Sequence, residues 1–262
     1  MKLQAINEAN ATEIYRALRH VKLFCDWPDD LLMAAAQSSK IMDAKAGEQI
    51  VRQGQVLQGL YVIASGEIAI GVYNKDGRRY VRRYAARGEV YGLLSMLDGK
   101  GSPQFYITHV ATKIIFVPKA VILDALEREP QLWWGIVRQW AVYHRNQLAA
   151  LHQAAFETLR VRLLRALLDY ASKFGAVELT NTPTKLRLTQ DELAELLGVT
   201  RQTISRELKH LEREGHIQIM YRGILLNKPA ALLPMVQRKA RPDDPLHSQA
   251  RTQYVARPPE MS

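Results

Sequence analysis

The sequence contains little that would hold a metal cluster or cross a membrane. Cys25 is the one cysteine among 262 residues, which excludes an intrachain disulfide and an iron–sulfur cluster with its usual set of about four thiolates. The N-terminal stretch lacks the apolar core of a signal peptide, and no later run approaches the roughly 18 to 20 apolar residues of a membrane span. We therefore expect a cytoplasmic protein, not bound to a membrane, in which Cys25 is a half-buried structural thiol.

Motifs of catalysis are absent as well. The chain has no glycine-rich phosphate loop, no His/Cys cluster with metal-ligand spacing and no nucleophile motif. We therefore expect no catalytic site, no metal and no cofactor.

Acidic residues are in the minority. The 36 Lys and Arg residues outnumber the 26 Asp and Glu residues, so the net charge is +10. A basic balance favours a polyanionic partner such as DNA. A solvated cationic surface is the alternative, because Lys and Arg are spread over both halves of the sequence.

Two patterns divide the chain, whose length suggests two modest domains. Between Ile41 and Pro118 the apolar runs are short and punctuated by glycine, which predicts an antiparallel barrel or sandwich with a turn at 74–77. Residues 131–174 are almost free of glycine and proline and predict two helices, the second of which ends at Gly175.

The first of these helices carries an apolar stripe at spacings of three and four residues. Such a stripe is long enough for a two-stranded coiled coil. We interpret it as the seam of a homodimer; the alternative is that it packs on the chain's own barrel. The stripe consists of Val137, Ala141, His144, Leu148, Leu151 and Ala155, among which His144 is the polar exception.

The stretch LTQDELAELLGVTRQTISRELKHLEREGHI, residues 188–217, predicts a helix-turn-helix. Thr189 and Glu192 have the spacing of a capping box, which marks the start of the first helix. Gly198 tolerates a positive φ at the end of that helix, and Thr200 can cap the second one.

The second helix places polar residues of its first turns together. Ile204, Leu208 and Leu211 face the core, so the opposite face carries Arg, Gln and Ser, residue types that suit base edges in DNA. The next segment, HIQIMYRGILLN, predicts a hairpin that turns at Arg222-Gly223 and forms the wing of a winged helix. The DNA contacts that we predict are Arg201, Gln202, Ser205, Arg206, Thr189, Gln190, Thr200, Thr203, Lys209 and Arg222.

These motifs carry a resemblance to a known family. The stretch LTQDELAELLGVTRQTISRELKHLEREG resembles the helix-turn-helix of CRP/FNR-family transcription regulators, and AGEQIVRQGQVLQGLYVIASGEIAI resembles their cyclic-nucleotide-binding-type β-roll. Over residues 20–230 the resemblance implies a bacterial homodimer on a pseudo-palindromic site in double-stranded DNA, with RNA polymerase as a further partner. It places Arg201, Gln202, Ser205 and Arg206 at base-reading positions, where a Glu commonly stands in place of Gln202.

The fold class implied by the resemblance is α+β, with an antiparallel, jelly-roll-like β-roll as sensor domain, a long dimerisation helix and a C-terminal winged helix-turn-helix domain. We expect a helical arm over 1–22, the β-roll over 23–129, the dimerisation helix over 130–156, the DNA-binding domain over 157–230 and a disordered, basic, proline-rich tail over 231–262.

The resemblance also marks an effector pocket. In cyclic-AMP-binding members a Glu holds the ribose, an Arg-Ser pair holds the cyclic phosphate and a Thr-Ser pair contacts adenine. In this sequence Leu93 aligns with the Glu, Ser102 and Pro103 with the Arg-Ser pair, and Gln147 and Leu148 with the Thr-Ser pair. Burying a phosphate without a paired cation is costly, so we expect that cyclic AMP is not the effector.

Other sources of control stay open. Arg82, Arg83 or Arg87 can supply the missing cation, although their segment more simply predicts an exposed strand followed by a turn. An unknown, apolar effector and control through protein abundance alone are further alternatives. A haem sensor is another, and its candidate ligands are His20, Cys25, His109 and His144.

Overall fold

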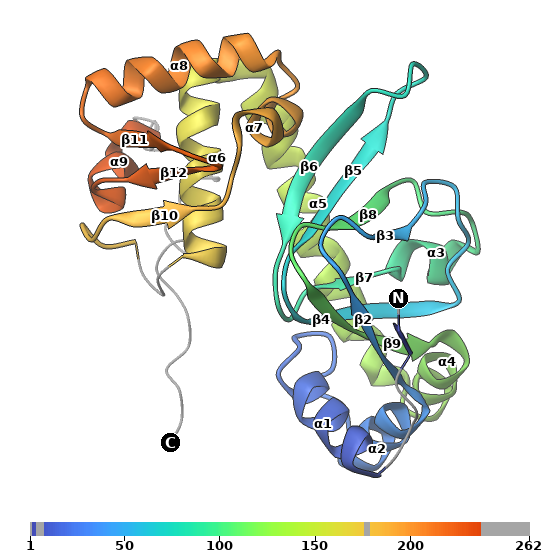
Figure 1. The fold of residues 1–262 in the computed structure, drawn as a ribbon. Coiled ribbons are helices and arrows are strands. Elements are labelled where there is room, and N and C mark those ends of the chain that lie inside the picture. The colour runs from blue at the N-terminus through green and yellow to red at the C-terminus, as the bar shows by residue number, and fades with distance from the viewer. Residues whose placement is uncertain (1, 4–7, 176–178, 237–262) are drawn as a thin grey trace, which may run out of the picture. The chain divides into compact units, whose positions relative to one another are not determined.

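The computed structural model describes residues 2–3, 8–175 and 179–236, within two compact units, Met1–His152 and Gln153–Ser262. Both units combine helices with antiparallel sheets (Figure 1), so the predicted α+β class is confirmed. Within the described part of the chain, none of the helices has both the length and the apolar character needed to traverse a bilayer.

The first unit is built on two antiparallel sheets that form the predicted β-roll. One sheet has the strand order β1-β2-β9-β4-β7, and the other has the order β3-β8-β5-β6. Their apolar runs are short because glycine-containing turns end most of them. The strands are β1 (Lys2–Leu3), β2 (Lys40–Ala44), β3 (Gln49–Val51), β4 (Gly59–Ser65), β5 (Ile68–Tyr73), β6 (Arg79–Ala85), β7 (Val90–Tyr91), β8 (Phe105–Thr108) and β9 (Thr112–Pro118).

The β5–β6 hairpin shows how a glycine ends a strand. The Gly77 amide donates to the Asn74 carbonyl at 3.1 Å, and the Asn74 amide donates to the Arg78 carbonyl at 3.0 Å. Gly77 has a φ of 77°, a left-handed conformation that costs glycine little. The predicted turn at 74–77 is confirmed.

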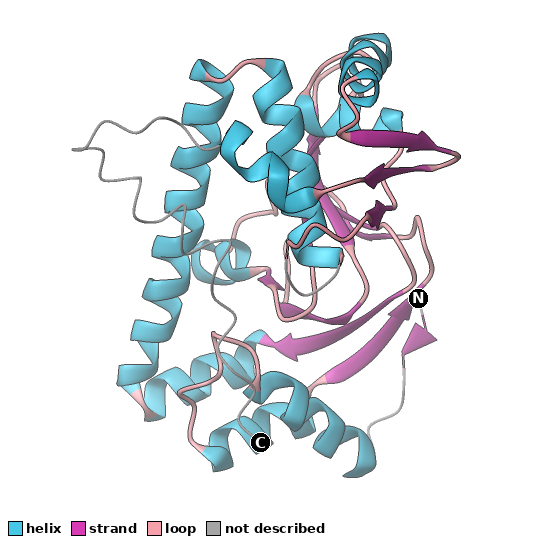
Figure 2. Ribbon diagram, turned by 90° about the vertical axis from the view of Figure 1, so that its left-hand side faces the viewer, coloured by secondary structure: helices cyan, strands magenta, loops and turns pink. Residues whose placement is uncertain are grey.

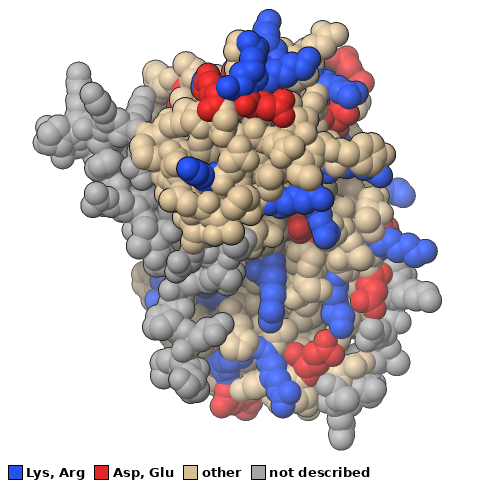
Figure 3. Space-filling view, turned by 60° about the vertical axis from the view of Figure 1, so that its left-hand side comes forward, with Lys and Arg blue, Asp and Glu red and all other residues tan. Residues whose placement is uncertain are grey.

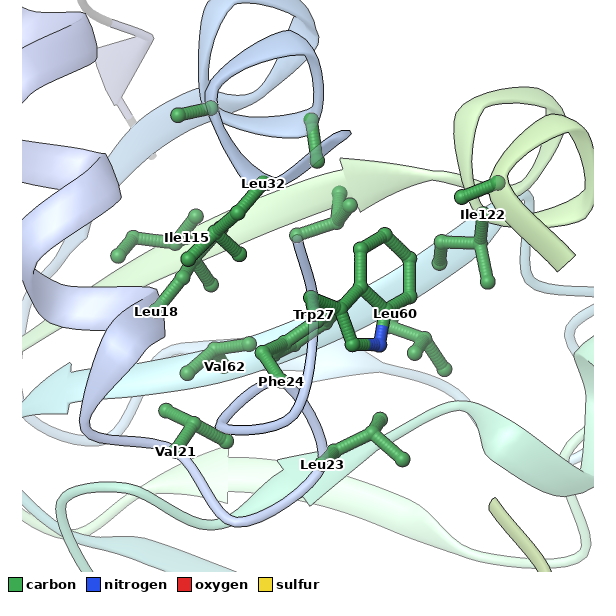
Figure 4. Packing of buried hydrophobic residues seen from close by; sticks show 14 of the residues in the cluster. Leu18, Val21, Leu23, Phe24, Trp27, Leu32, Leu60, Val62, Ile115 and Ile122 are labelled. Atoms are coloured by element: carbon green, nitrogen blue, oxygen red, sulfur yellow. The ribbon is translucent and has the colours of Figure 1, made fainter. Parts of the chain in front are cut away.

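Helices lie against the strands of the roll (Figures 1 and 2). They are α1 (Glu8–Arg19), α2 (Asp29–Ser38) and α4 (Lys119–Arg128), and α2 and α4 pack on β9. The space between them and the sheet is filled by an apolar cluster in which Phe24 and Trp27 meet edge to face at 5.1 Å (Figure 4). Two aromatic side chains in one short loop therefore anchor the helices to the sheet.

Cys25 lies in this loop and is exposed, so the expectation of a half-buried thiol is wrong. Its neighbours Phe24 and Trp27 occupy the core, which leaves the intervening side chain toward solvent. The Cys25 Sγ donates to the Lys22 carbonyl at 3.2 Å.

Two more helices complete this unit. A short helix, α3 (Leu93–Asp98), follows β7, and a 3₁₀ turn (Pro130–Leu132) leads into the long helix α5 (Trp133–Phe156). The last residues of α5 belong to the second unit. A long helix was predicted for this segment, and it is confirmed.

The second unit is a helical domain with a small sheet. Its core is formed by one face of α6, where Leu163, Leu164, Leu167 and Leu168 are inaccessible to solvent. The Thr158 hydroxyl caps the start of α6, and Gly175 follows its end as predicted. The elements are α6 (Leu159–Phe174), β10 (Thr184–Leu186), α7 (Gln190–Leu197), α8 (Arg201–Arg213), β11 (Ile217–Met220), β12 (Gly223–Leu226) and α9 (Pro229–Val236).

Helix α9 corrects the start of the predicted tail. Residues 231–236 are helical and pack on α6, because Leu232 and Val236 are buried. The Arg165 guanidinium also donates to the Val236 carbonyl at 2.9 Å. The remainder of the predicted tail, 237–262, lies outside the described residues.

Candidate functional site

Helix α7 begins with the predicted capping box. The Thr189 hydroxyl accepts a hydrogen bond from the Glu192 amide at 3.2 Å, and the Glu192 carboxylate accepts one from the Thr189 amide at 2.7 Å. Both bonds satisfy amides that a helix start leaves without partners. This arrangement fixes the residue at which α7 starts.

The turn between α7 and α8 is also the predicted one. Gly198 has φ 68° and ψ 32°, a left-handed conformation that suits glycine. The Thr200 hydroxyl accepts from the Thr203 amide at 3.2 Å and caps α8. Arg162 of α6 donates to the Leu197 carbonyl at 2.8 Å, which ties the end of α7 to the core helix.

Helix α8 divides into a buried face and a solvent face. Ile204, Leu208 and Leu211 are completely buried and hold the helix on the domain. The solvent face carries the predicted DNA-contacting residues. Arg201, Gln202, Arg206 and Lys209 are exposed, whereas Thr203 and Ser205 are half-buried.

Arg201 has an acidic neighbour that the sequence analysis did not identify. Its guanidinium lies 3.6 Å from the carboxylate of Asp191 in the first turn of α7, and both side chains are about two-thirds exposed, at 67% and 64%. An exposed pair of this kind is worth about 0.2 to 1 kcal/mol. Across the surface in Figure 3, basic side chains are likewise interspersed with acidic ones.

The wing is a hairpin of β11 and β12, as predicted, but its turn lies one residue earlier. Met220 pairs with Gly223, so Tyr221 and Arg222 form the turn. Gly223 is the first residue of β12, and a Cβ there would lie 2.7 Å from the Leu186 carbonyl oxygen of β10, so the position requires glycine. Arg222 adopts a φ of 55° and is exposed at the tip of the wing.

Two of the predicted contacts have a structural role as well. The hydroxyls of Thr189 and Thr200 are engaged in helix caps, and the hydroxyl of Thr203 lies 2.9 Å from that of Thr200. Gln190, the first residue of α7, is half-buried. The side chains that are most available to a ligand are therefore the long ones of α8 and Arg222.

The stripe on α5 is exposed along its whole length. Leu148 is 57% and Leu151 is 70% accessible to solvent. The other members of the stripe, also exposed, are Val137, Ala141, His144 and Ala155. An apolar stripe of this size on a surface indicates a binding face.

The first unit contains a cavity of about 80 Å³ between the roll and α5. Leu93, Ser102 and Pro103 line it, as predicted. Gln147 and Leu148 do not line it. The α5 residues in its wall are Gln139, Trp140 and Tyr143, so the predicted pair lies roughly one helical turn too far along the chain.

Arg83 is the charged residue in the cavity wall, and sequence reasoning placed it on an exposed strand. It forms an ion pair with Glu89, whose carboxylate also accepts from the Ala86 amide at 3.0 Å. Its neighbour Arg82 reaches α5, where it donates to the Tyr143 hydroxyl at 3.5 Å.

Aromatic residues of the cavity wall were missed. They come from two strands and one helix: Tyr91 from β7, Tyr106 from β8, and Trp140 and Tyr143 from α5. Tyr91 and Tyr106 stack at 4.3 Å. The sequence signal was weak, because aromatic residues in strands are ordinary core residues.

The candidate haem ligands lie in separate parts of the first unit, since His20 follows α1, Cys25 lies in the loop before α2, His109 lies between β8 and β9, and His144 lies on α5. Among the described residues, no cluster of three or more His, Cys, Asp or Glu side chains is arranged to hold a metal ion. His109 lies beside Glu67 at 3.9 Å and packs edge-on against Tyr84 at 4.9 Å. His144 is exposed on α5. Although Cys25 is exposed as a residue, partial desolvation of its Sγ and the neighbouring Asp26 carboxylate raise the pKa of the thiol.

Two family models match the chain. A cyclic nucleotide-binding domain matches residues 41–129, and a Crp-like helix-turn-helix domain matches residues 161–235. The first match covers most strands of the roll, and the second covers the elements from α6 to α9.

Two curated relatives match this chain over most of their own length. The CRP-like cAMP-activated global transcriptional regulator of Mycobacterium tuberculosis is 23% identical over 75% of this chain and 88% of its own. The nitrogen fixation regulation protein FixK of Azorhizobium caulinodans is 27% identical over 70% of this chain and 74% of its own.

Solved structures share the fold. The c-di-GMP responsive global regulator CLP of Xanthomonas campestris has a TM-score of 0.62 at 20% identity and covers 72% of this chain and 94% of its own. A CRP/FNR-family transcriptional regulator of Thermus thermophilus has a TM-score of 0.59 at 21% identity and covers 76% and 100%. Domain models, relatives and fold agree, and the chain belongs to the CRP/FNR family of transcription regulators.

Proposed function

We propose that this protein is a homodimeric regulator of the cytoplasm that binds a pseudo-palindromic DNA site and reads its sequence with α8. One observation carries the proposal. The buried residues Ile204, Leu208 and Leu211 hold α8 on the domain, while its solvent face presents Arg201, Gln202, Arg206 and Lys209.

The side chains at the start of α8 suit the major groove. Arg binds guanine O6 and N7 through two hydrogen bonds, and Gln binds adenine N6 and N7 in the same way. Arg206 lies one turn after Gln202 on the solvent face, so both can approach neighbouring base pairs. The capped N-terminus of α8 adds a favourable partial positive charge near phosphates.

The remaining predicted contacts suit the DNA backbone. Lys209 lies further along α8, and Arg222 lies at the tip of the wing, where a long cationic side chain reaches a phosphate without reading a base. Each phosphate contact steepens the fall of log binding constant with log salt concentration by about 0.9. These two residues should therefore set affinity and position rather than sequence preference.

The exposed stripe on α5 supports a homodimer. Leu148 and Leu151 lie on one face of a 24-residue helix, and pairing two such faces about a two-fold axis would bury them. A symmetric dimer of winged helices reads two half-sites about 34 Å apart, one helical turn of DNA. RNA polymerase is the further partner that we propose for the bound dimer.

The cavity of the roll supports an effector other than cyclic AMP. Leu93 has no carboxylate for a ribose hydroxyl, and Ser102 and Pro103 have no guanidinium for a phosphate. Arg83 already pairs with Glu89. A phosphate in this cavity would have to break that pair or be buried without a cation, which is costly.

The test is selection of bound sequences from random DNA with the full chain, followed by affinity measurements on Arg206→Ala. We expect an enriched pseudo-palindrome. The substitution should cost about 1 to 3 kcal/mol on that site and relax discrimination at one base pair.

Arg213→Ala is the matched control, because Arg213 is an exposed arginine in the last turn of the same helix. It should leave base preference unchanged. Equal losses on selected and random DNA for Arg206→Ala would make Arg206 a phosphate contact. Failure to enrich any sequence would refute the proposed function itself.

A further inference from the structure

The exposed stripe on α5 has the seven-residue repeat of a two-stranded coiled coil. Trp134, which is 66% exposed, extends the stripe by about one turn toward the N-terminus. Two series of residues with a spacing of seven, offset by three, then occupy the a and d positions of a heptad, whose side chains meet between two helices. The residues at these positions are Trp134, Val137, Ala141, His144, Leu148, Leu151 and Ala155. His144 is the polar member, and it is exposed.

Two copies of this seam fit together in parallel. Each chain continues from the C-terminal end of α5 into its DNA-binding elements, so parallel helices bring both sets to the same end of the seam and to one stretch of DNA. In a parallel pair about a two-fold axis, a d residue lies beside the same residue of the partner. The two His144 side chains would therefore meet at the axis, near the middle of a 24-residue helix.

The charged residues of α5 are all basic. The structure describes every residue of this helix, and none is Asp or Glu. Arg138 and Arg145 carry its permanent charges, and Arg145 directly follows His144. The roll adds a further cation, because Arg82 donates to the hydroxyl of Tyr143, the residue before His144, at 3.5 Å.

Two carboxylates near α5 already have partners. The Asp26 carboxylate lies 2.7 Å from the guanidinium of Arg138. Glu89 pairs with Arg83, which lies in the cavity wall between the roll and α5. A protonated pair of His144 side chains would therefore place like charges at the axis beside further cations, which is unfavourable.

We propose that the two His144 side chains pair across the two-fold axis and make dimerisation sensitive to acid, an inference that rests on the homodimer of the proposed function. Neutral imidazoles can pair, because each has one nitrogen that donates and one that accepts. Protonated imidazoles only donate, so they repel each other. Histidine changes its charge between about pH 8 and 5. Separate chains then bind protons that the dimer excludes, so a fall in pH favours the separate chains.

The size of the effect follows from two protons. Free histidine titrates near about pH 6.5, so complete exclusion of both protons from the dimer raises its dissociation constant about a hundredfold between about pH 7.5 and about pH 5.5. Partial protonation of the dimer makes the rise smaller, and we expect roughly ten- to a hundredfold. Analytical ultracentrifugation of the full chain at the two pH values measures it.

Two substitutions assign the pH effect to one histidine. His144→Leu places an apolar residue at a d position, so the dimer should be tighter than the wild-type dimer and its dissociation constant should change by less than about threefold between the two pH values. His152→Gln is the matched control, because His152 lies on the same helix but outside the seven seam positions. It should keep the pH dependence of the wild type.

Cross-linking tests the pairing itself. A Cys25→Ser background removes the chain's one cysteine. In this background, His144→Cys should form an interchain disulfide under a mild oxidant. Asn146→Cys is its control and should stay uncross-linked under the same conditions, because Asn146 is exposed on α5 but lies off the seam.

The outcomes separate this inference from the proposed function. A chain that is monomeric at about pH 7.5 refutes the homodimer and this inference together. A dimer with the same dissociation constant at both pH values overturns the inference alone, and so does an equal pH effect in His144→Leu. Cross-linking of His144→Cys that is no faster than that of Asn146→Cys overturns it as well.

Discussion

Replacing Thr189 by Ala tests whether its hydroxyl serves helix α7 or the DNA. The hydroxyl accepts from the Glu192 amide at 3.2 Å and lies 2.8 Å from the Glu192 carboxylate, which also accepts from the Thr189 amide at 2.7 Å. The substitution therefore removes both bonds of the hydroxyl and leaves only the bond from the backbone amide to the Glu192 carboxylate. Because these bonds engage the hydroxyl, we expect its loss to affect stability more than DNA affinity.

The magnitude follows from the cap. Losing an N-cap hydroxyl costs about 0.5 to 2 kcal/mol, and typically about 1. For a domain of 60 to 100 residues, 1 kcal/mol lowers the unfolding midpoint by about 4 to 8 °C. The affinity for the selected site, measured well below that midpoint, should fall by less than about threefold, or 0.6 kcal/mol.

Differential scanning calorimetry and fluorescence anisotropy with labelled DNA measure the two effects on the full chain. Thr189→Ser is the control, because serine keeps the hydroxyl and caps as well as threonine. An alanine variant that unfolds at the wild-type temperature but binds DNA at least tenfold more weakly would refute this reasoning. Thr189 would then be a phosphate contact.

Three further results are expected. Leu151→Glu should give monomers by light scattering, because it places like charges near the two-fold axis. Val142→Glu should stay dimeric, because Val142 is exposed on the same helix but lies off the stripe. A dimeric Leu151→Glu variant would place the seam elsewhere. Asp191→Asn should raise affinity for the selected site by about 1.4- to fivefold, since it frees Arg201 from a pair worth about 0.2 to 1 kcal/mol. A loss of affinity would mean that the pair orients Arg201. Cyclic AMP should bind with millimolar or weaker affinity in titration calorimetry; a micromolar constant would show that Arg83 has left its carboxylate partner for the phosphate.

The parts of the fold that sequence predicted well are those that depend on neighbours a few residues apart. Thr189 and Glu192 need only helical geometry to meet, and Gly198 needs only a positive φ. The same holds for the buried face of α8, where Ile204 and Leu208 share one side of the helix because they are four residues apart.

Long-range pairing explains what was missed. Strand β10 is three residues long and is defined by its pairing with β12, about forty residues later, so it has no periodic signature of its own. Gly223 looked like a turn glycine, yet it is required by the close approach of β10. Local rules cannot distinguish a glycine that turns the chain from one that lets another strand pass.

Of the predicted cavity residues, those near α3 line the cavity and those on α5 do not, again because long-range packing decides which residues of α5 meet the roll. Leu93, Ser102 and Pro103 follow from a linear alignment, because they lie in or beside the segment around α3. Tyr91 and Trp140 face the same cavity although they are about fifty residues apart, and which turn of α5 reaches the roll is set by packing. The alignment therefore placed Gln147 about one helical turn too far along α5.

The tryptophans of this chain all lie in its first unit. Trp27 is buried in the core of the roll, and the other three, Trp133, Trp134 and Trp140, lie on α5. The DNA-binding unit, which carries α8, contains none. Tryptophan emission therefore reports unfolding of the first unit and not of the winged-helix unit, whereas far-ultraviolet circular dichroism reports unfolding of both units. Unfolding curves that differ between the two signals would mean that the two units lose their structure independently, and one free energy would no longer describe the chain.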